Sequence, residues 1–171
     1  AVTRRRRIVR RKIVGHWSWF EALPAVNDSE FWSKIYRSEN YQWDLKQPAP
    51  ALMDMLPRLR LPKSRILILG CGQGNDAAYF AEHGPHVTAI DISTEALIEA
   101  KKRYGHLPNI QWLEADLFKL GPEHHKAYDI IFEHTCYCAI DPTRRNELIM
   151  QWRKCLVDGG FLLGIFFAME R

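Results

Sequence analysis

The sequence predicts an α/β fold built on a doubly wound, mostly parallel sheet, and two observations carry that prediction. Apolar runs of strand length alternate with segments of helical periodicity over about 100 residues. A glycine-rich turn, Gly70-Cys71-Gly72-Gln73-Gly74, follows the first of these runs and precedes a helix. With right-handed crossovers, this pattern gives five strands in the order 3-2-1-4-5. Ligands then bind beyond the carboxyl ends of strands 1, 2 and 4.

The expected elements follow one another in a regular order. A cap at Asp28 or Ser29 begins a helical segment over residues 28–44, in which aromatic and apolar side chains recur at helical spacing. Four prolines divide the next stretch, where residues 52–56 indicate a short helix. The five strands are expected at residues 65–69, 86–90, 110–113, 128–133 and 161–167. The helices between them are expected at residues 76–83, 94–104 and 144–156, and Asp158-Gly159-Gly160 predicts a turn.

The length and composition are those of a single domain. The chain has 171 residues, of which 47% are hydrophobic and 26% charged, which excludes collagen-like, low-complexity and wholly disordered chains. No apolar run approaches the ~20 residues of a membrane-spanning helix. We expect a basic leader over residues 1–20 and one domain over 21–171, with a helical cap (28–62) and an α/β core (63–171).

The positive net charge of +4 comes from the leader. Seven of the 24 Lys and Arg residues lie in residues 1–12, which contain no acid, so 17 basic side chains face 20 acidic ones in the remainder, a net charge of −3. This acidic balance argues against a broad nucleic-acid-binding face. The leader itself could contact RNA, DNA or anionic lipid by charge, and resembles a transit segment, but a flexible tail is the favoured interpretation.

The four cysteines match no disulfide framework, which favours reduced thiols and a cytoplasmic location. His134-x-Cys136-x-Cys138 has the residue types of a metal site. A zinc site needs a second ligand pair, and the sequence contains none. We therefore expect no metal.

The spacing of the glycine-rich turn indicates the class of cofactor. A dinucleotide fingerprint requires Gly or Ala at the sixth position, for close packing of helix on strand. Asn75 stands there, and Gly74 occupies the fifth position. The pattern G-x-G-x-G is typical of nucleoside-binding methyltransferases, in which the methionine end of the donor lies along the loop.

Acidic residues follow the next two strands. Asp91 is placed to accept hydrogen bonds from both ribose hydroxyls, and it disfavours a 2′-phosphate; capping of the next helix is the alternative role. After strand 3, Asp116 can accept from the exocyclic amine of adenine, and Leu117 can offer its backbone N–H to a ring nitrogen. A surface turn would explain Asp116 equally well if it stood alone. Three signals at three successive strand ends favour the binding role.

The segment after strand 4 is rich in polar and aromatic side chains and is expected to face the transferable methyl group. It reads Glu133-His134-Thr135-Cys136-Tyr137-Cys138-Ala139-Ile140-Asp141-Pro142, followed by Arg145. With this segment, residues 65–167 resemble class I S-adenosylmethionine-dependent methyltransferases, and within them the thiopurine methyltransferase superfamily with its halide and thiol branch. The aromatic segment Trp32, Tyr36 and Trp43-Asp44, followed by the proline-rich stretch, is similar as well.

The resemblance implies S-adenosylmethionine as the cofactor, with the aromatic side chains closing over it or, alternatively, forming a plain helix core. The expected cofactor-binding residues are Trp32, Tyr36, Trp43, Leu69, Gly70, Cys71, Gly72, Gly74, Asp91, Ile92, Asp116, Leu117 and Glu133. The implied acceptor is a small thiol, a thiopurine-like compound or a halide. The implied catalytic residues are Arg145, which stabilises the acceptor, Tyr137, which walls its pocket, and His134 as a base. By charge alone, Arg144 would serve as well as Arg145.

The chain departs from the resemblance in two places. The family continues into strands 6 and 7, whereas the printed sequence ends at Arg171, so we expect a truncated product or a minimal variant. An open apolar edge on strand 5 then predicts self-association or a partner strand. Glu133-His134 also replaces the Asp-Tyr or Asp-Arg pair of relatives, which leaves the acceptor preference open.

Three other functions remain open from the sequence. The first is an NAD-dependent oxidoreductase, which the missing sixth-position glycine opposes. The second is a catalytically impaired module that binds S-adenosylmethionine without transferring its methyl group. The third is an RNA methyltransferase guided by the basic leader.

Overall fold

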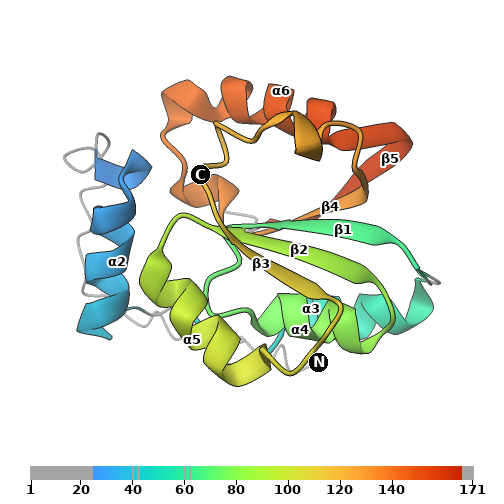
Figure 1. The fold of residues 1–171 in the computed structure, drawn as a ribbon, viewed down its shortest axis with the longest axis horizontal. Helices are drawn as coiled ribbons and strands as arrows, with labels where there is room; N and C mark the ends of the chain where they lie inside the picture. The colour runs from blue at the N-terminus through green and yellow to red at the C-terminus, as the bar shows by residue number, and fades with distance from the viewer. Residues whose placement is uncertain (1–24, 40, 42, 60, 62, 167–171) are drawn as a thin grey trace, which may run out of the picture.

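A five-stranded sheet in the order β3-β2-β1-β4-β5 forms the centre of the molecule (Figure 1). The computed structural model describes residues 25–39, 41, 43–59, 61 and 63–166. The basic leader, residues 1–20, and Phe167 of the expected fifth strand lie outside the described residues. The strand pairs formed by the described residues are all parallel, so the predicted fold class and strand order are confirmed.

The elements alternate as the sequence predicts. The strands are β1 (Arg65–Leu69), β2 (His86–Asp91), β3 (Ile110–Glu114), β4 (Tyr128–His134) and β5 (Leu156–Ile165). The α-helices are α2 (Ser29–Ser38), α3 (Pro50–Met55), α4 (Asn75–Glu82), α5 (Thr94–Tyr104) and α6 (Arg145–Cys155). The 3-10 helices are η1 (Ala25–Asn27), η2 (Leu56–Arg58), η3 (Pro122–His124), η4 (Tyr137–Ala139) and η5 (Pro142–Arg144). Among the described residues, every helix is too short or too polar to cross a membrane.

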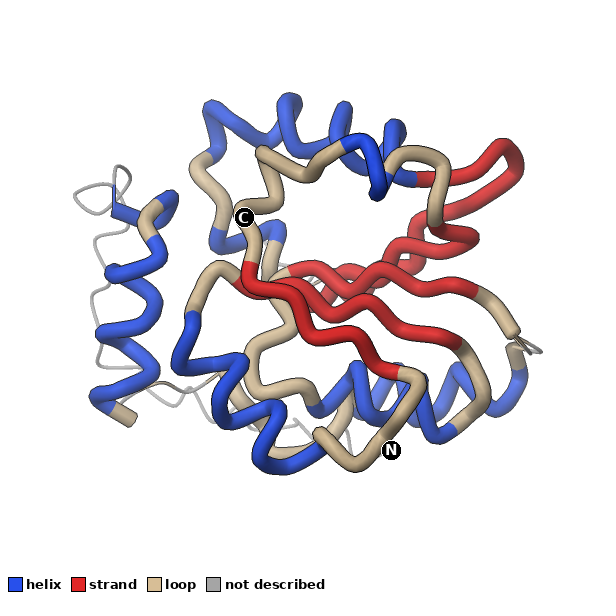
Figure 2. The backbone as a smooth tube through the Cα atoms, in the orientation of Figure 1, coloured by secondary structure: helices blue, strands red, loops and turns tan. Residues whose placement is uncertain are grey.

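Helices cover both faces of the sheet (Figure 2). The central strand β1 is apolar on both faces because Ile66 and Ile68 pack into one core, with α3 and α4, while Leu67 and Leu69 pack into another, with α6. All four of these side chains are buried. The two cores fix the sheet, and with it the loops at the carboxyl ends of the strands.

Helix α2 stands to one side of the sheet, next to α5 (Figure 1). Asp28 caps it by accepting from the N–H of Glu30, as predicted. The predicted extent, residues 28–44, is wrong: the helix ends at Ser38, and Glu39 takes the left-handed conformation with φ 53°. The sequence Ser38-Glu39-Asn40 offers no apolar side chain to extend the packed face of the helix.

Strand β5 starts five residues earlier than predicted. Leu156 already pairs with Tyr128, and the register then shifts so that Phe161 pairs with Ile130. The extra residues form a bulge that contains Gly159 at φ 84°. The turn expected at residues 158–160 is therefore an irregularity inside the strand, because pairing with β4 resumes beyond it.

Candidate active site

A cavity of about 770 Å³ opens at the carboxyl ends of the strands, where the topology predicts a ligand site. Its floor is the loop between β1 and α4. Gly70 and Gly72 both have φ 54°, in the left-handed region that favours glycine. A Cβ on Gly70 would lie 2.8 Å from Cys136 Sγ, and one on Gly72 would lie 3.0 Å from Tyr36 Oη. Glycine is needed here so that the walls can close over the loop.

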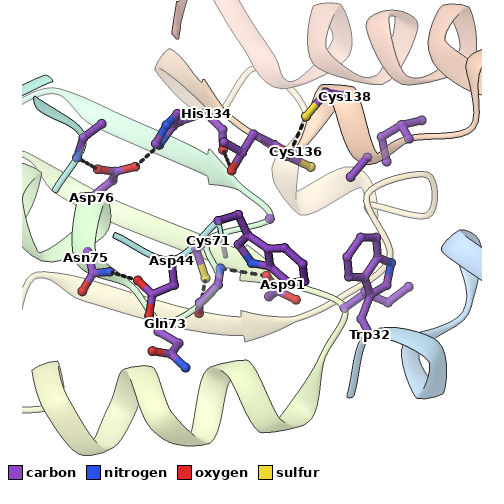
Figure 3. A pocket seen from close by; sticks show the side chains of 18 of the residues that line it. Trp32, Asp44, Cys71, Gln73, Asn75, Asp76, Asp91, His134, Cys136 and Cys138 are labelled. Atoms are coloured by element: carbon purple, nitrogen blue, oxygen red, sulfur yellow. Dashed lines mark hydrogen bonds and ion pairs between the residues drawn. The ribbon is translucent and has the colours of Figure 1, made fainter. Parts of the chain in front are cut away.

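Asp91 ends β2 and lines the cavity at 6% exposure (Figure 3). Its Oδ2 accepts from the N–H of Gly72 and its Oδ1 from that of Ser93, both at 2.8 Å. Burial raises the pKa of Asp91 above its usual value, although the N–H groups of Ser93, Gly72 and Ile92 oppose that shift. Because an ionised carboxylate offers about four acceptor sites, it keeps capacity for ligand hydroxyls beside these N–H groups.

The next wall follows β3. Asp116, Leu117 and Phe118 line the cavity there, next to Ile92, which follows β2. Asp116 Oδ1 accepts from the N–H of Phe118 at 2.9 Å, which shapes the turn. The acidic residues after β2 and β3 therefore share one cavity, as the sequence predicts for a nucleoside site.

Aromatic side chains close another side of the cavity. Trp32 and Tyr36 come from α2, and Trp43 comes from the segment after it; all three line the cavity. Trp43 meets Trp32 and Tyr36 edge-on, at centroid distances of 6.0 and 6.1 Å. We call these three side chains the aromatic cap.

The segment after β4 turns sharply into the cavity. Thr135, a β-branched residue, has φ 65°, an uncommon conformation that marks a constrained turn. Glu133 is 1% exposed and accepts from the N–H groups of Tyr137 and Cys136 at 2.9 and 3.2 Å. Burial raises the pKa of Glu133, and these N–H groups oppose the shift. Glu133 therefore stabilises the turn by accepting these two backbone hydrogen bonds.

A histidine and an aspartate meet at the end of the cavity away from Trp32 (Figure 3). His134 Nδ1 lies 2.9 Å from Asp76 Oδ2, and Asp76 Oδ1 accepts from the N–H of Ala49 at 2.7 Å. His134 was predicted from the sequence, whereas Asp76 was missed. Its only signal was an acid in the first turn of the helix that follows the glycine loop.

A further acid of the cavity wall was missed as a binding group. Asp44 Oδ1 accepts from Asn75 Nδ2 and from the N–H of Lys46, both at 2.8 Å. Asp44 Oδ2 is buried and has no hydrogen-bond partner among the described residues. A buried carboxylate oxygen without a partner suits a cationic ligand group.

Arg145 and Tyr137 lie behind the cavity wall. The guanidinium carbon of Arg145 is 4.9 Å from the ring centroid of Tyr137, and its Nη2 donates to the carbonyl of Cys138 at 3.4 Å. Cys138 lines the cavity, whereas Arg145 and Tyr137 do not. Their contact with an acceptor therefore stays a prediction.

The structure brings most of the predicted site residues to one cavity. Those that line it are Trp32, Tyr36, Trp43, Gly70, Cys71, Gly72, Asp91, Ile92, Asp116, Leu117 and His134. Leu69, Gly74 and Glu133, like Arg145 and Tyr137, are outside the lining. Gly74 faces the packed interior rather than the cavity, because a Cβ added there would lie 2.5 Å from the ring of Trp112.

Three thiols also line the cavity. Burial raises the pKa of Cys71 and Cys136 well above the usual value, and the charge of Asp91 adds to both shifts. Burial also raises the pKa of Cys138. Among the described residues, no three His, Cys, Asp or Glu side chains are grouped closely enough to hold a metal ion.

Comparison with known proteins identifies the family. The family model of thiopurine S-methyltransferase matches residues 27–169. A probable thiol methyltransferase 2 of Arabidopsis thaliana is 32% identical over 154 residues, covering 88% of this chain and 67% of that protein. Thiocyanate methyltransferase 1 of the same plant is 29% identical over 141 residues, covering 81% of this chain and 61% of that protein. The chain thus spans about two thirds of the length of these relatives.

Solved structures show the same fold. A structure described under the conversion of a disulfide bond into a thioacetal group in echinomycin biosynthesis superposes with a TM-score of 0.68 at 23% identity, covering 75% of this chain and 55% of that one. A Burkholderia thailandensis 1,6-didemethyltoxoflavin N1-methyltransferase superposes at 0.63 with 23% identity, covering 83% of this chain and 62% of that one. With the family model matched over residues 27–169, most of its length, the chain belongs to the thiopurine S-methyltransferase family.

Proposed function

We propose that this chain transfers the methyl group of S-adenosylmethionine to a small-molecule acceptor, with thiols, thiopurine-like compounds and halides as the candidate classes. The charge of the cavity wall carries the proposal. Asp44, Asp76, Asp91 and Asp116 line the cavity, and no Lys or Arg is among the described residues that do so. Such a wall favours a cationic donor, and it disfavours NAD, because a pyrophosphate would have no basic partner.

The described residues fit the donor part by part. Asp91 would accept from the ribose hydroxyls, while Asp116 and the Leu117 backbone would face the adenine. The Gly70–Gly72 backbone leaves room for the methionine end, and the unpaired Asp44 Oδ2 suits its ammonium group. The aromatic cap would exclude water from the site. When bound, the donor supplies a methyl group on a cationic sulfonium, whose departure leaves a neutral thioether.

Calorimetric titration of the purified chain with S-adenosylmethionine, and separately with NAD, tests the donor. We expect binding of the first only. Asp91→Ala should weaken it about 10- to 100-fold, because hydrogen bonds to a charged group are worth about 1.5–3 kcal/mol each. Asp158→Ala is the matched control, since that side chain is 92% exposed on the far bulge. Preferential NAD binding would refute the proposal.

Transfer is tested with isotopically labelled donor and a panel of thiols, iodide and thiocyanate. Methylation of at least one acceptor supports the proposed enzyme. Donor binding of ordinary strength without any transfer would support the alternative of a binding module.

We also propose a reducing, cytoplasm-like location and small molecules as the partners of the site. The four cysteines support the location, because all are free thiols whose spacing matches no disulfide framework. The cavity supports the partners, because about 770 Å³ suits a nucleoside with a small acceptor.

A further inference from the structure

One end of the cavity carries the geometry of a general base. His134 Nδ1 is 2.9 Å from Asp76 Oδ2, and the two side chains are 13% and 17% exposed. Asp76 is held in turn by the N–H of Ala49 at 2.7 Å. A carboxylate at Nδ1 fixes the tautomer with the proton on Nδ1, which leaves the lone pair on Nε2. His134 thus comes from β4 and Asp76 from α4, and the N–H that holds Asp76 comes from the N-cap residue of α3.

The second nitrogen of His134 is Nε2, and the described residues leave it accessible. Among the described residues, no hydrogen-bond partner of Nε2 is found, and Nε2 is not one of the polar atoms buried without a partner. His134 also lines the cavity. Its lone pair is therefore available to a molecule that enters there.

Among the described residues that line the cavity around His134, none is a Lys or Arg. Asp76 faces it from α4, Glu133 precedes it on β4, and Cys136 and Cys138 lie on the segment that follows. From β5 and the start of α3, the cavity wall presents Ile165, Ala49 and other uncharged side chains. Arg145 contacts the carbonyl of Cys138 but does not line the cavity, so an anionic acceptor would have the donor's sulfonium as its cationic partner there, whereas a neutral thiol would need a base.

We propose that His134, positioned by Asp76, takes the proton from a neutral thiol, so that the acceptor class is protonated thiols rather than preformed anions such as halides. This inference rests on the proposed function. The S–H proton passes to Nε2, and the freed sulfur electron pair forms the new bond to the methyl carbon. The bond from that carbon to the sulfonium breaks and leaves its electron pair on the departing thioether. The imidazolium then returns its proton to water.

The test compares acceptors that differ in whether they carry a proton. Turnover is measured from pH 6 to 9 with an alkyl thiol, which is mostly protonated at pH 7, and with an aryl thiol already ionised there, or iodide. His134→Gln should lower kcat/KM for the alkyl thiol by about 10²- to 10⁴-fold at pH 7. The loss should shrink as the pH approaches the thiol's own pKa, which is about 8.5 when the alkyl thiol is a cysteine side chain. Turnover of the ionised acceptor and donor binding should change less than about 3-fold, and His106→Gln, an exposed control, should change neither.

Asp76→Asn tests the positioning role separately. Asn can still accept from Ala49 through its Oδ1, so the local fold is retained. Its amide N–H would face Nδ1 and favour the tautomer that carries the proton on Nε2, a change that costs about 10⁴-fold in a serine protease triad. We expect the same pH-dependent loss for the alkyl thiol as in His134→Gln. An unchanged pH profile would contradict the positioning role.

The outcomes separate this inference from the proposed function. If His134→Gln lost turnover equally with the alkyl thiol and the ionised acceptor, or lost it with neither, His134 would not be the general base. A wild-type chain that methylates iodide but no neutral thiol would overturn the inference alone. A chain that binds the donor and methylates nothing would overturn the proposed function, and the inference with it.

Discussion

At the residue scale, Asp91 combines two tasks in one buried carboxylate. It holds the glycine loop through the N–H of Gly72 and presents its remaining acceptor sites to the cavity. Burial gives it a raised pKa, because water no longer stabilises the charge. Asp91 therefore takes up a proton at a higher pH than an ordinary aspartate does.

Donor affinity should therefore fall in acid earlier than an ordinary aspartate would predict. With a raised pKa, Asp91 takes up its proton above pH ~3.9, the usual value, and the protonated form accepts hydroxyl hydrogen bonds poorly. Affinity should be full while Asp91 is ionised and should decline as the pH drops through its raised pKa. Calorimetry between pH 5 and 8 checks this, with circular dichroism to confirm folding. In Asp91→Asn the decline should be reduced; an identical decline would assign it to another group.

The residue scale also shows what the sequence could predict about the site. Asp91 and Asp116 were identified because each directly follows a strand, and the carboxyl ends of neighbouring parallel strands share an edge. The pair of Asp76 and His134 joins residues 58 positions apart, through a contact that exists only once α4 packs beside β4. Local pattern cannot reveal such a pair.

At the element scale, α2 carries two of the three aromatic side chains of the cap, and a buried contact between two serines helps to hold it against α5. Ser33 Oγ lies 3.1 Å from Ser93 Oγ, and both residues are buried. Ser93 also caps α5, since its Oγ accepts from the N–H of Ala96. The cap is thus positioned from the start of α5, just after Asp91.

Ser33→Ala should loosen the aromatic cap without unfolding the core. The substitution removes the contact with Ser93 and the hydrogen bond to Glu95, which costs at least about 1 kcal/mol, while Ser93 keeps its role in α5. We expect donor affinity to fall about 5-fold, while thermal unfolding shifts by only a few degrees. Lys34→Ala, an exposed change on the same helix, is the control. Equal affinities of Ser33→Ala and wild type would show that this contact does not position the cap.

Elements of the core were predictable because their signals are local. The run Arg65–Leu69 is continuously apolar after its first residue, and the structure gives β1 the same bounds. The end of α2 and the start of β5 were not predictable in this way. The first depends on where packing on α5 stops. The second depends on pairing of Leu156 with Tyr128 before the glycines of the bulge.

At the scale of the whole molecule, the sheet has an apolar edge. Among the described residues, β5 pairs with β4 alone. Phe161, Leu162 and Phe166 are 46%, 40% and 58% exposed. We expect this chain to self-associate through that edge, with a sedimentation coefficient that rises with concentration. Leu162→Lys should reduce the association and leave donor binding unchanged; association that persists unaltered would place the contact elsewhere.

The three thiols of the cavity wall determine whether the protein can be methylated by its own donor. The proposed donor is an alkylating agent, and Cys71, Cys136 and Cys138 share the cavity with it. Only a thiolate attacks such a reagent readily, and desolvation together with the charge of Asp91 or Glu133 raises the pKa of each thiol, including the exposed Cys138. We therefore expect the bound donor to methylate these wall thiols slowly, and a neutral acceptor thiol in the same environment to need a base such as the proposed His134.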